Sequence, residues 1–148
     1  MRQQDLYDTD FYQWTQAQAA LLRDGKARDL DWTNLAEELD TLGRSERHGL
    51  EHRLGVLLRH LLKWRYQPDK RQYGHSWQST MVEQRYRIHK RLRSSPSLRP
   101  LLPQMVQEEY AQARQRASLE TRLPLATFPE VCPWDVAQVL DDAFFPEG

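Results

Sequence analysis

Leucines recur at every third or fourth position between Trp32 and Tyr66, and this spacing predicts one long α-helix with an apolar face. The stripe is a single residue wide at first and gains paired positions at Leu57–Leu62, as a deeply buried segment requires. Gly43 and Gly49 each disfavour helix by about 1 kcal/mol relative to alanine, which leaves a kink or break between them open. The rest of the chain is arranged around this helix.

Apolar residues with the same periodicity predict further helices at 7–24, at 76–93 and from about 97 to 119, and a short one at 134–140. No strand pattern and no internal repeat is present. With 148 residues, the chain is expected to form one domain, 1–148. The predicted fold is all-α: an up-and-down helical bundle of about four main helices, with one long central helix and a short C-terminal helix.

Local signals mark the ends of two of these helices. Thr9 or Asp10 can cap the first one, and Gly25 ends it. Pro68 ends the long helix, because the residue before a proline is disfavoured in helical conformation. The first helix is expected to bury an apolar stripe made of Phe11, Trp14, Ala17, Leu21 and Leu22.

Composition favours a soluble, cytoplasmic protein. The mean hydropathy is −0.83, and no run approaches the roughly 18 apolar residues of a membrane helix, so no membrane association is expected. The acidic N-terminus has no signal-peptide pattern. The single cysteine, Cys132, cannot form an internal disulfide, as is usual in a reducing compartment.

The formal net charge is zero, but the charges are segregated. Residues 1–51 carry −5, residues 59–99 carry +9 and residues 100–148 carry −5. In the basic segment 59–93, aromatic residues alternate with cations, a pattern typical of single-stranded nucleic-acid binding. The alternative is that the acidic flanks fold over the basic helices and neutralise them. The candidate surface comprises Arg59, Arg65, Lys70, Arg71, Arg87, Lys90, Arg91 and Arg93, with Trp64, Tyr66, Tyr73, Trp77 and Tyr86 between them.

Six motifs occur together in this order over residues 7 to 146: YDTDFYQW, LDWTNLAEELDTLGRSER, LLRHLLKW, HSWQST, SPSL and FPEVCPW. In these the chain resembles a bacterial family catalogued as domain of unknown function twenty-nine. The resemblance implies an all-α, up-and-down bundle. It implies no activity, because the family has no established biochemical function.

His48, Glu51 and His52 spell H-x-x-E-H, in which two histidines one helical turn apart bind zinc and the glutamate activates water. Glu120 is a conceivable third ligand. The α/β context of such peptidases is absent, and two surface histidines are the simpler interpretation. A metal-dependent hydrolase is therefore only a minor hypothesis.

A set of polar residues lies near the predicted apolar seams: Glu37, Glu38, His60, Lys63 and Arg85. Di-iron helical bundles use a Glu-x-x-His spacing, which neither Glu37 nor Glu38 provides. The favoured interpretation is structural, with Glu37 or Glu38 paired to Arg85 or Lys63 in a polar layer of the bundle. No cofactor is predicted.

The absence of a phosphate-binding loop, a nucleophile motif and a C-x-x-C pair favours a non-catalytic protein. The predicted function is a protein–protein interaction module, with another protein or a second copy of itself as partner. The alternatives are a nucleic-acid-associated module using residues 59–93 and the metal-dependent hydrolase.

Overall fold

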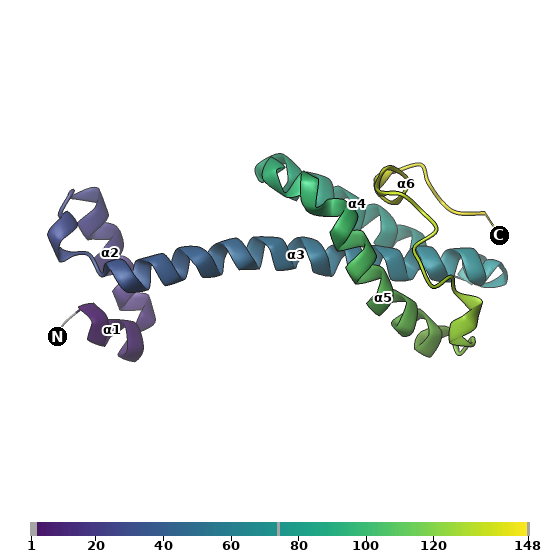
Figure 1. Ribbon diagram of the computed structural model, residues 1–148, viewed down its shortest axis with the longest axis horizontal. Coiled ribbons are helices and arrows are strands. Elements are labelled where there is room, and N and C mark those ends of the chain that lie inside the picture. The colour runs from purple at the N-terminus through teal and green to yellow at the C-terminus, as the bar shows by residue number, and fades with distance from the viewer. Residues whose placement is uncertain (1–2, 74, 148) are drawn as a thin grey trace. The chain divides into compact units, whose positions relative to one another are not determined.

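The computed structural model describes residues 3–73 and 75–147, with side chains at 5–71 and 76–147 (Figure 1). Every regular element among these residues is helical, so the predicted all-α helical-bundle fold is confirmed. Short 3-10 turns join several of the helices. The α-helices are α1 (Gln3–Thr9), α2 (Phe11–Arg23), α3 (Trp32–Tyr66), α4 (His75–Ser94), α5 (Leu102–Thr121) and α6 (Val136–Leu140).

Internal contacts divide the chain into two compact units, Met1–Glu46 and Arg47–Gly148, which are called unit 1 and unit 2 below. The helix α3 begins in unit 1 and ends in unit 2, and it runs without a break through Gly43 and Gly49. The break that these glycines left open therefore does not form. The expectation of one domain over residues 1–148 stays a prediction.

Unit 1 begins with two helices where the sequence predicts one over 7–24. Asp10 separates them, because it adopts the extended φ of −150° that suits a helix cap. Its carboxylate accepts a hydrogen bond of 3.0 Å from the backbone N–H of Gln13, in the first turn of α2. The predicted cap at Asp10 is confirmed, and Gly25, with a φ of +71°, follows the end of α2.

A buried carboxylate joins α2 to the start of α3. Asp31 accepts hydrogen bonds from the indole N–H of Trp14 at 3.0 Å and from the amide of Asn34 at 2.8 Å. The backbone N–H of Asp31 donates to the side chain of Gln18 at 2.9 Å. Trp14 and Gln18 are the buried residues of α2, whereas Phe11 and Leu22 are about half exposed. The predicted stripe of α2 is therefore correct at Trp14 and wrong at its two ends.

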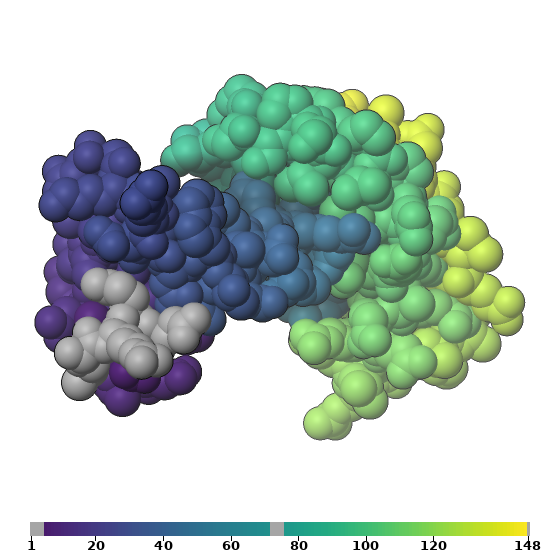
Figure 2. Space-filling model, turned by 60° about the vertical axis from the view of Figure 1, so that its left-hand side comes forward, coloured from purple at the N-terminus to yellow at the C-terminus, as the bar shows by residue number. Residues whose placement is uncertain are grey.

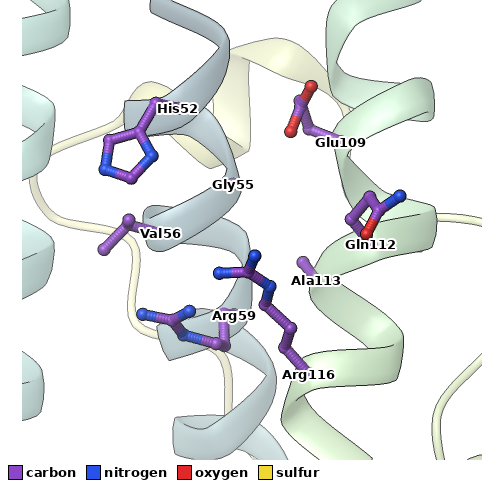
Figure 3. Close-up of a pocket in the computed structure, with 8 residues that line it drawn as sticks. All are labelled: His52, Gly55, Val56, Arg59, Glu109, Gln112, Ala113 and Arg116. Atoms are coloured by element: carbon purple, nitrogen blue, oxygen red, sulfur yellow. The ribbon is translucent and has the colours of Figure 1, made fainter. Parts of the chain in front are cut away.

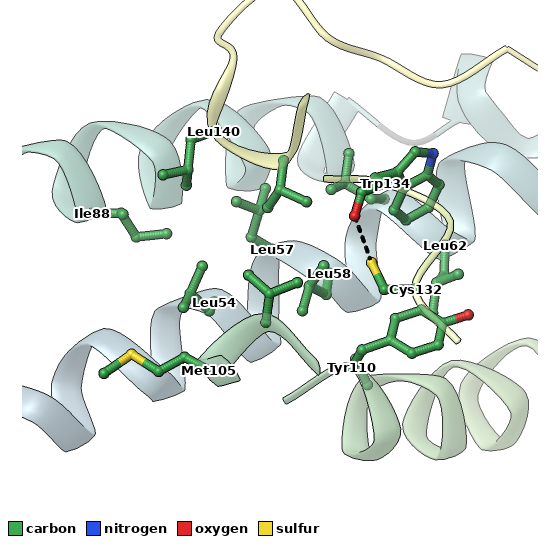
Figure 4. Close-up of a cluster of buried hydrophobic side chains, with 14 of the residues drawn as sticks. Leu54, Leu57, Leu58, Leu62, Ile88, Met105, Tyr110, Cys132, Trp134 and Leu140 are labelled. Atoms are coloured by element: carbon green, nitrogen blue, oxygen red, sulfur yellow. Dashed lines mark hydrogen bonds between the residues drawn. The ribbon is translucent and has the colours of Figure 1, made fainter. Parts of the chain in front are cut away.

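Unit 2 contains the hydrophobic core. The second half of α3 buries six leucines completely, and α4 and α5 pack against them (Figures 1 and 4). This agrees with the paired apolar positions that the sequence shows near Leu57–Leu62. Core side chains from the three helices include Leu50, Leu54, Leu57, Leu58, Leu61, Leu62, Met81, Ile88, Leu92, Met105, Val106, Tyr110, Ala113 and Ala117.

The C-terminal stretch completes this core. Cys132 is buried, its thiol donates to the carbonyl of Trp134 over 3.3 Å, and burial raises the pKa of the thiol (Figure 4). Asp135 and Gln138 form a reciprocal capping box at the start of α6, which begins two residues later than predicted. None of the described helices combines the length and apolar composition of a membrane-spanning segment.

The two halves of α3 supply a matched test of where the core lies. Leu57 is fully buried and Leu42 is 65% exposed on the same helix. We expect Leu57→Ala to lower the free energy of unfolding by about 3 kcal/mol, because it leaves a cavity in the core. Leu42→Ala should change it by less than about 0.5 kcal/mol. Urea unfolding followed by circular dichroism measures both, and equal effects would contradict this position of the core.

Candidate functional site

A polar pocket of about 220 Å³ lies between α3 and α5 in unit 2 (Figure 3). Each helix contributes four residues at the same spacing of three, one and three, so each wall is one helical face. The pocket exists because Gly55 and Ala113 are small where the two helices face one another. Its lining consists of His52, Gly55, Val56 and Arg59 from α3, and Glu109, Gln112, Ala113 and Arg116 from α5.

Glu109 is the acidic group of the pocket, and it forms no ion pair with a described residue. A side-chain carbon at Gly55 would lie 3.2 Å from its carboxylate oxygen, so the glycine makes room for the acid. Burial raises the pKa of Glu109, and the nearby charges of Glu51 and Glu108 raise it further. The charges of His52 and Arg116 act to lower the pKa of Glu109.

Two guanidinium groups, one from each helix, also line the pocket. Arg116 extends from α5 across the space toward α3 (Figure 3). Arg59 lies 3.4 Å from the carboxylate of Glu120, which also pairs with Lys63 at 2.5 Å. Although partial burial acts to raise the pKa of Glu120, the hydrogen bond from Lys63 and the two positive charges lower it overall.

The lining offers groups that complement a polar ligand. Arg59 and Arg116 are cations for an anionic group, the Glu109 carboxylate can accept from a hydrogen-bond donor, and the Gln112 amide can donate or accept. The pocket is therefore suited to a small polar ligand.

The predicted polar cluster does not assemble in one place. Glu38 accepts a hydrogen bond from Tyr7 inside unit 1, and Glu37 is exposed. Lys63 pairs instead with Glu120. Lys63 follows Glu38 by 25 positions in α3, or about 37 Å along the helix axis, so the two cannot meet. The expected pairing of Lys63 with Glu37 or Glu38 is wrong for this reason.

The other two members of that cluster have backbone partners. His60 lies 2.7 Å from the carbonyl of Val56, and burial lowers the pKa of the imidazole. Arg85 is fully buried and donates to the carbonyl of Val139 at 2.9 Å. Both side chains thus contact backbone carbonyls within unit 2, and the structural role expected for them stays a prediction.

The H-x-x-E-H residues form ion pairs on the surface of α3. Glu51 accepts from Arg47 at 2.9 Å and lies 3.0 Å from a ring nitrogen of His48. His52 instead lines the pocket with Glu109. Nowhere in residues 3–73 and 75–147 do three His, Cys, Asp or Glu side chains gather as metal ligands would.

The basic segment is partly neutralised. Among the described residues, four of its cations face carboxylates: Arg59 and Lys63 at Glu120, Arg71 at Glu147 and Arg87 at Glu83. Arg65 lies over the ring of Tyr66 at 4.8 Å, Arg91 is half-buried, and Lys70, Lys90 and Arg93 are exposed. Among the aromatics, Tyr86 is 56% exposed, and the side chain of Tyr73 lies outside the described residues.

An exposed apolar seam runs along the first half of α3, in unit 1. Its members follow steps of three, four and three residues, the spacing with which helices pair in coiled coils. Trp32, Leu39 and Leu42 are 62%, 67% and 65% exposed, and Leu35 between them is half-buried. We call these four residues the α3 seam.

The pocket residues on α5 were missed by the sequence interpretation, although a signal for them exists. Glu109, Gln112 and Arg116 each lie next to a member of the buried stripe Tyr110, Ala113 and Ala117, so they border the core at helical spacing. Their facing residues on α3 border the leucine stripe in the same way. Periodicity identifies both faces but not the register that brings them together.

Glu109 provides a test of the pocket's electrostatics. Because its pKa is raised on folding, ionisation of this carboxyl favours the unfolded chain as the pH rises above about 4.3. Glu109→Gln should therefore unfold at a higher temperature than the wild-type protein at pH 7, and the difference should vanish below about pH 4. Glu108→Gln, at the exposed neighbouring position, is the control. Equal melting temperatures of the wild-type protein and Glu109→Gln at pH 7 would contradict the shift.

Comparisons with known proteins concern the whole chain and not the pocket alone. No curated protein and no solved structure matches it. A family model described as "Domain of unknown function DUF29" matches residues 6–145, nearly the whole length of the chain. The motif resemblance and the helical fold agree with this match. The chain belongs to the DUF29 family.

Proposed function

We propose that this chain is a cytoplasmic, non-catalytic protein-binding module that uses the α3 seam to bind a basic amphipathic helix of a partner protein. The observation that carries the proposal is the exposure of Trp32, Leu39 and Leu42 on one helical face. Contiguous exposed apolar residues of this size are costly in water and typically mark an interaction surface.

The seam has the geometry that a second helix needs. Its spacing matches the first and fourth positions of a heptad, at which helices interdigitate. Small residues, Ala36 and Gly43, lie directly beside it, and the space around Gly43 is open. Because these two side chains are small, the backbone of a partner helix can approach α3 closely at this point.

Charge favours a basic partner. Residues 1–46 contain 5 Lys and Arg against 10 Asp and Glu, a net charge of −5. Glu37 and Asp40 are exposed within the same two turns of α3 as Leu39. A helix with lysine or arginine beside its leucines would complement this field, whereas a second copy of α3 would bring acid to acid.

The alternatives have weaker support. Four cations of segment 59–93 face carboxylates among the described residues, and these carboxylates would compete with phosphates. For a hydrolase, the Glu51 carboxylate is held in ion pairs with Arg47 and His48. The buried, unreactive state of Cys132 suits a protein of the reducing cytoplasm.

The test uses a designed peptide of about 21 residues, with leucine at the heptad seam and lysine on both sides of it. Fluorescence anisotropy should detect saturable binding to the wild-type protein. The double variant L39E/L42E should weaken binding by about 30-fold, because losing two buried leucine contacts costs about 2 kcal/mol.

Leu119→Glu is the matched control, because Leu119 is 78% exposed but lies on α5 in unit 2. It should bind the peptide like the wild-type protein. A version of the peptide with glutamate in place of lysine should not bind. The proposal fails if L39E/L42E binds unchanged, or if both peptides bind equally. Sedimentation that shows a wild-type dimer, lost in L39E/L42E, would instead identify a second copy as the occupant.

A further inference from the structure

Arg85 is a completely buried cation whose hydrogen-bonding capacity is mostly unused. Its Nε donates to the carbonyl of Val139 at 2.9 Å, at the C-terminal end of α6. Its other two nitrogens, Nη1 and Nη2, are buried without an acceptor among the described residues. A buried ion normally has its donors satisfied, because leaving them unpaired is costly. A guanidinium with both terminal nitrogens unpaired has the fork geometry that binds two oxygens of one anion.

A second buried donor without an acceptor belongs to Trp64, which contacts the same aromatic ring as Arg85, that of Phe145. The indole nitrogen of Trp64 is also buried without an acceptor in the described part of the chain. The ring of Phe145 lies 5.4 Å from the ring of Trp64, and its centre lies 5.5 Å from the guanidinium carbon of Arg85. Phe145 therefore contacts one residue of α3 and one of α4 that each have a buried donor without an acceptor among the described residues.

The segment that carries Phe145 is held by Arg71 and by its two phenylalanine rings. Residues 141–147 follow α6 without regular structure, and they run along the surface of unit 2 (Figure 2, yellow). Arg71 donates to the carbonyl of Pro146 at 3.2 Å and lies 3.7 Å from the carboxylate of the exposed Glu147. The same guanidinium donates to the carbonyl of Trp64 at 2.7 Å. Arg71 thus holds the end of the segment, and the rings of Phe144 and Phe145 pack against the core.

A shallow hollow on the surface of unit 2 borders α4 within about one helical turn of Arg85. It is lined by Val82, Tyr86, His89 and Arg93 of α4 and by Asp142 of the C-terminal segment. His89 lies one helical turn after Arg85, and its ring is 2.9 Å from the carbonyl of Leu140. Burial lowers the pKa of Arg85, whereas the charges of Asp142 and Asp141 raise it, so these carboxylates lie within electrostatic range. Neither aspartate makes a hydrogen bond to the guanidinium among the described residues.

We propose that Arg85 forms a binding site for an oxyanion, a carboxylate or a phosphate group, and that Phe145 and the C-terminal segment cover it. The guanidinium supplies two parallel N–H donors. Asp142 competes with the ligand for the same cation. This site belongs to unit 2 and is independent of the α3 seam.

The test measures the melting temperature of the full-length protein in low-salt buffer during titration with sodium acetate or sodium phosphate. Sodium chloride at equal ionic strength controls for screening. Each binding anion should raise the melting temperature of the wild-type protein saturably, because a ligand of the native state stabilises it. The anion with the lower half-saturating concentration identifies the group, carboxylate or phosphate, that the site prefers.

Three variants locate the effect. Arg85→Met should abolish the anion-dependent shift and, without anion, should melt no lower than the wild-type protein, because it removes an unpaired buried charge. Asp142→Asn should lower the half-saturating concentration several-fold, because it removes the competing carboxylate. Phe145→Ala should lower it as well, by removing the cover. Arg87→Met is the matched control, because Arg87 is exposed two residues away and pairs with Glu83. It should respond like the wild-type protein.

The proposal is overturned if acetate and phosphate act no differently from chloride on the wild-type protein. It is also overturned if Arg85→Met keeps the anion response. If Phe145→Ala does not fold, Asp142→Asn decides, because Asp142 is exposed and its replacement leaves the packing of Phe145 intact. An unchanged half-saturating concentration in Asp142→Asn would count against the site.

Discussion

The structure depends on the burial of six leucines along the second half of α3. Each of them is inaccessible to solvent, and each contributes on the order of 2 kcal/mol of hydrophobic stabilisation. Helices α4 and α5 pack on this apolar face, and the C-terminal stretch closes the remaining side with Phe128, Trp134 and Val139. Because the core is formed here, the first half of α3 is not needed to build it. Leu39 and Leu42 in that first half stay largely exposed.

Polar groups in unit 2 connect the elements that the core brings together. Arg85 and His89, one turn apart on α4, approach the last carbonyls of α6, where the helix dipole favours positive charge. Tyr110 and Arg114 of α5 donate to backbone carbonyls of the chain that follows it. These contacts supply hydrogen-bond donors to backbone carbonyls that have no partner in a regular helix.

The helices could be predicted from the sequence more completely than the contacts between them. Periodicity predicts α3 with its observed ends, because burial on one face leaves a direct trace in residue spacing. It does not reveal that Leu39 and Leu42 stay exposed. Leucines at this spacing occur both on helices that pack in a core and on helices that bind a partner. The break at Asp10 was also missed, because the apolar steps continue across it. The pairing expected for Lys63 failed on helix length alone, and the pocket around Glu109 depends on a register between α3 and α5 that one sequence does not encode locally.

The burial of Cys132 has a practical consequence for work in solution. A thiol with a raised pKa, enclosed in the core and donating to the carbonyl of Trp134, reacts slowly with maleimides, since only the thiolate is nucleophilic. The protein therefore behaves toward such reagents as if it had no cysteine. A thiol introduced at an exposed position such as Thr41 would be modified alone. Spin labels and fluorophores are thus usable at chosen sites without first removing a side chain from the interior.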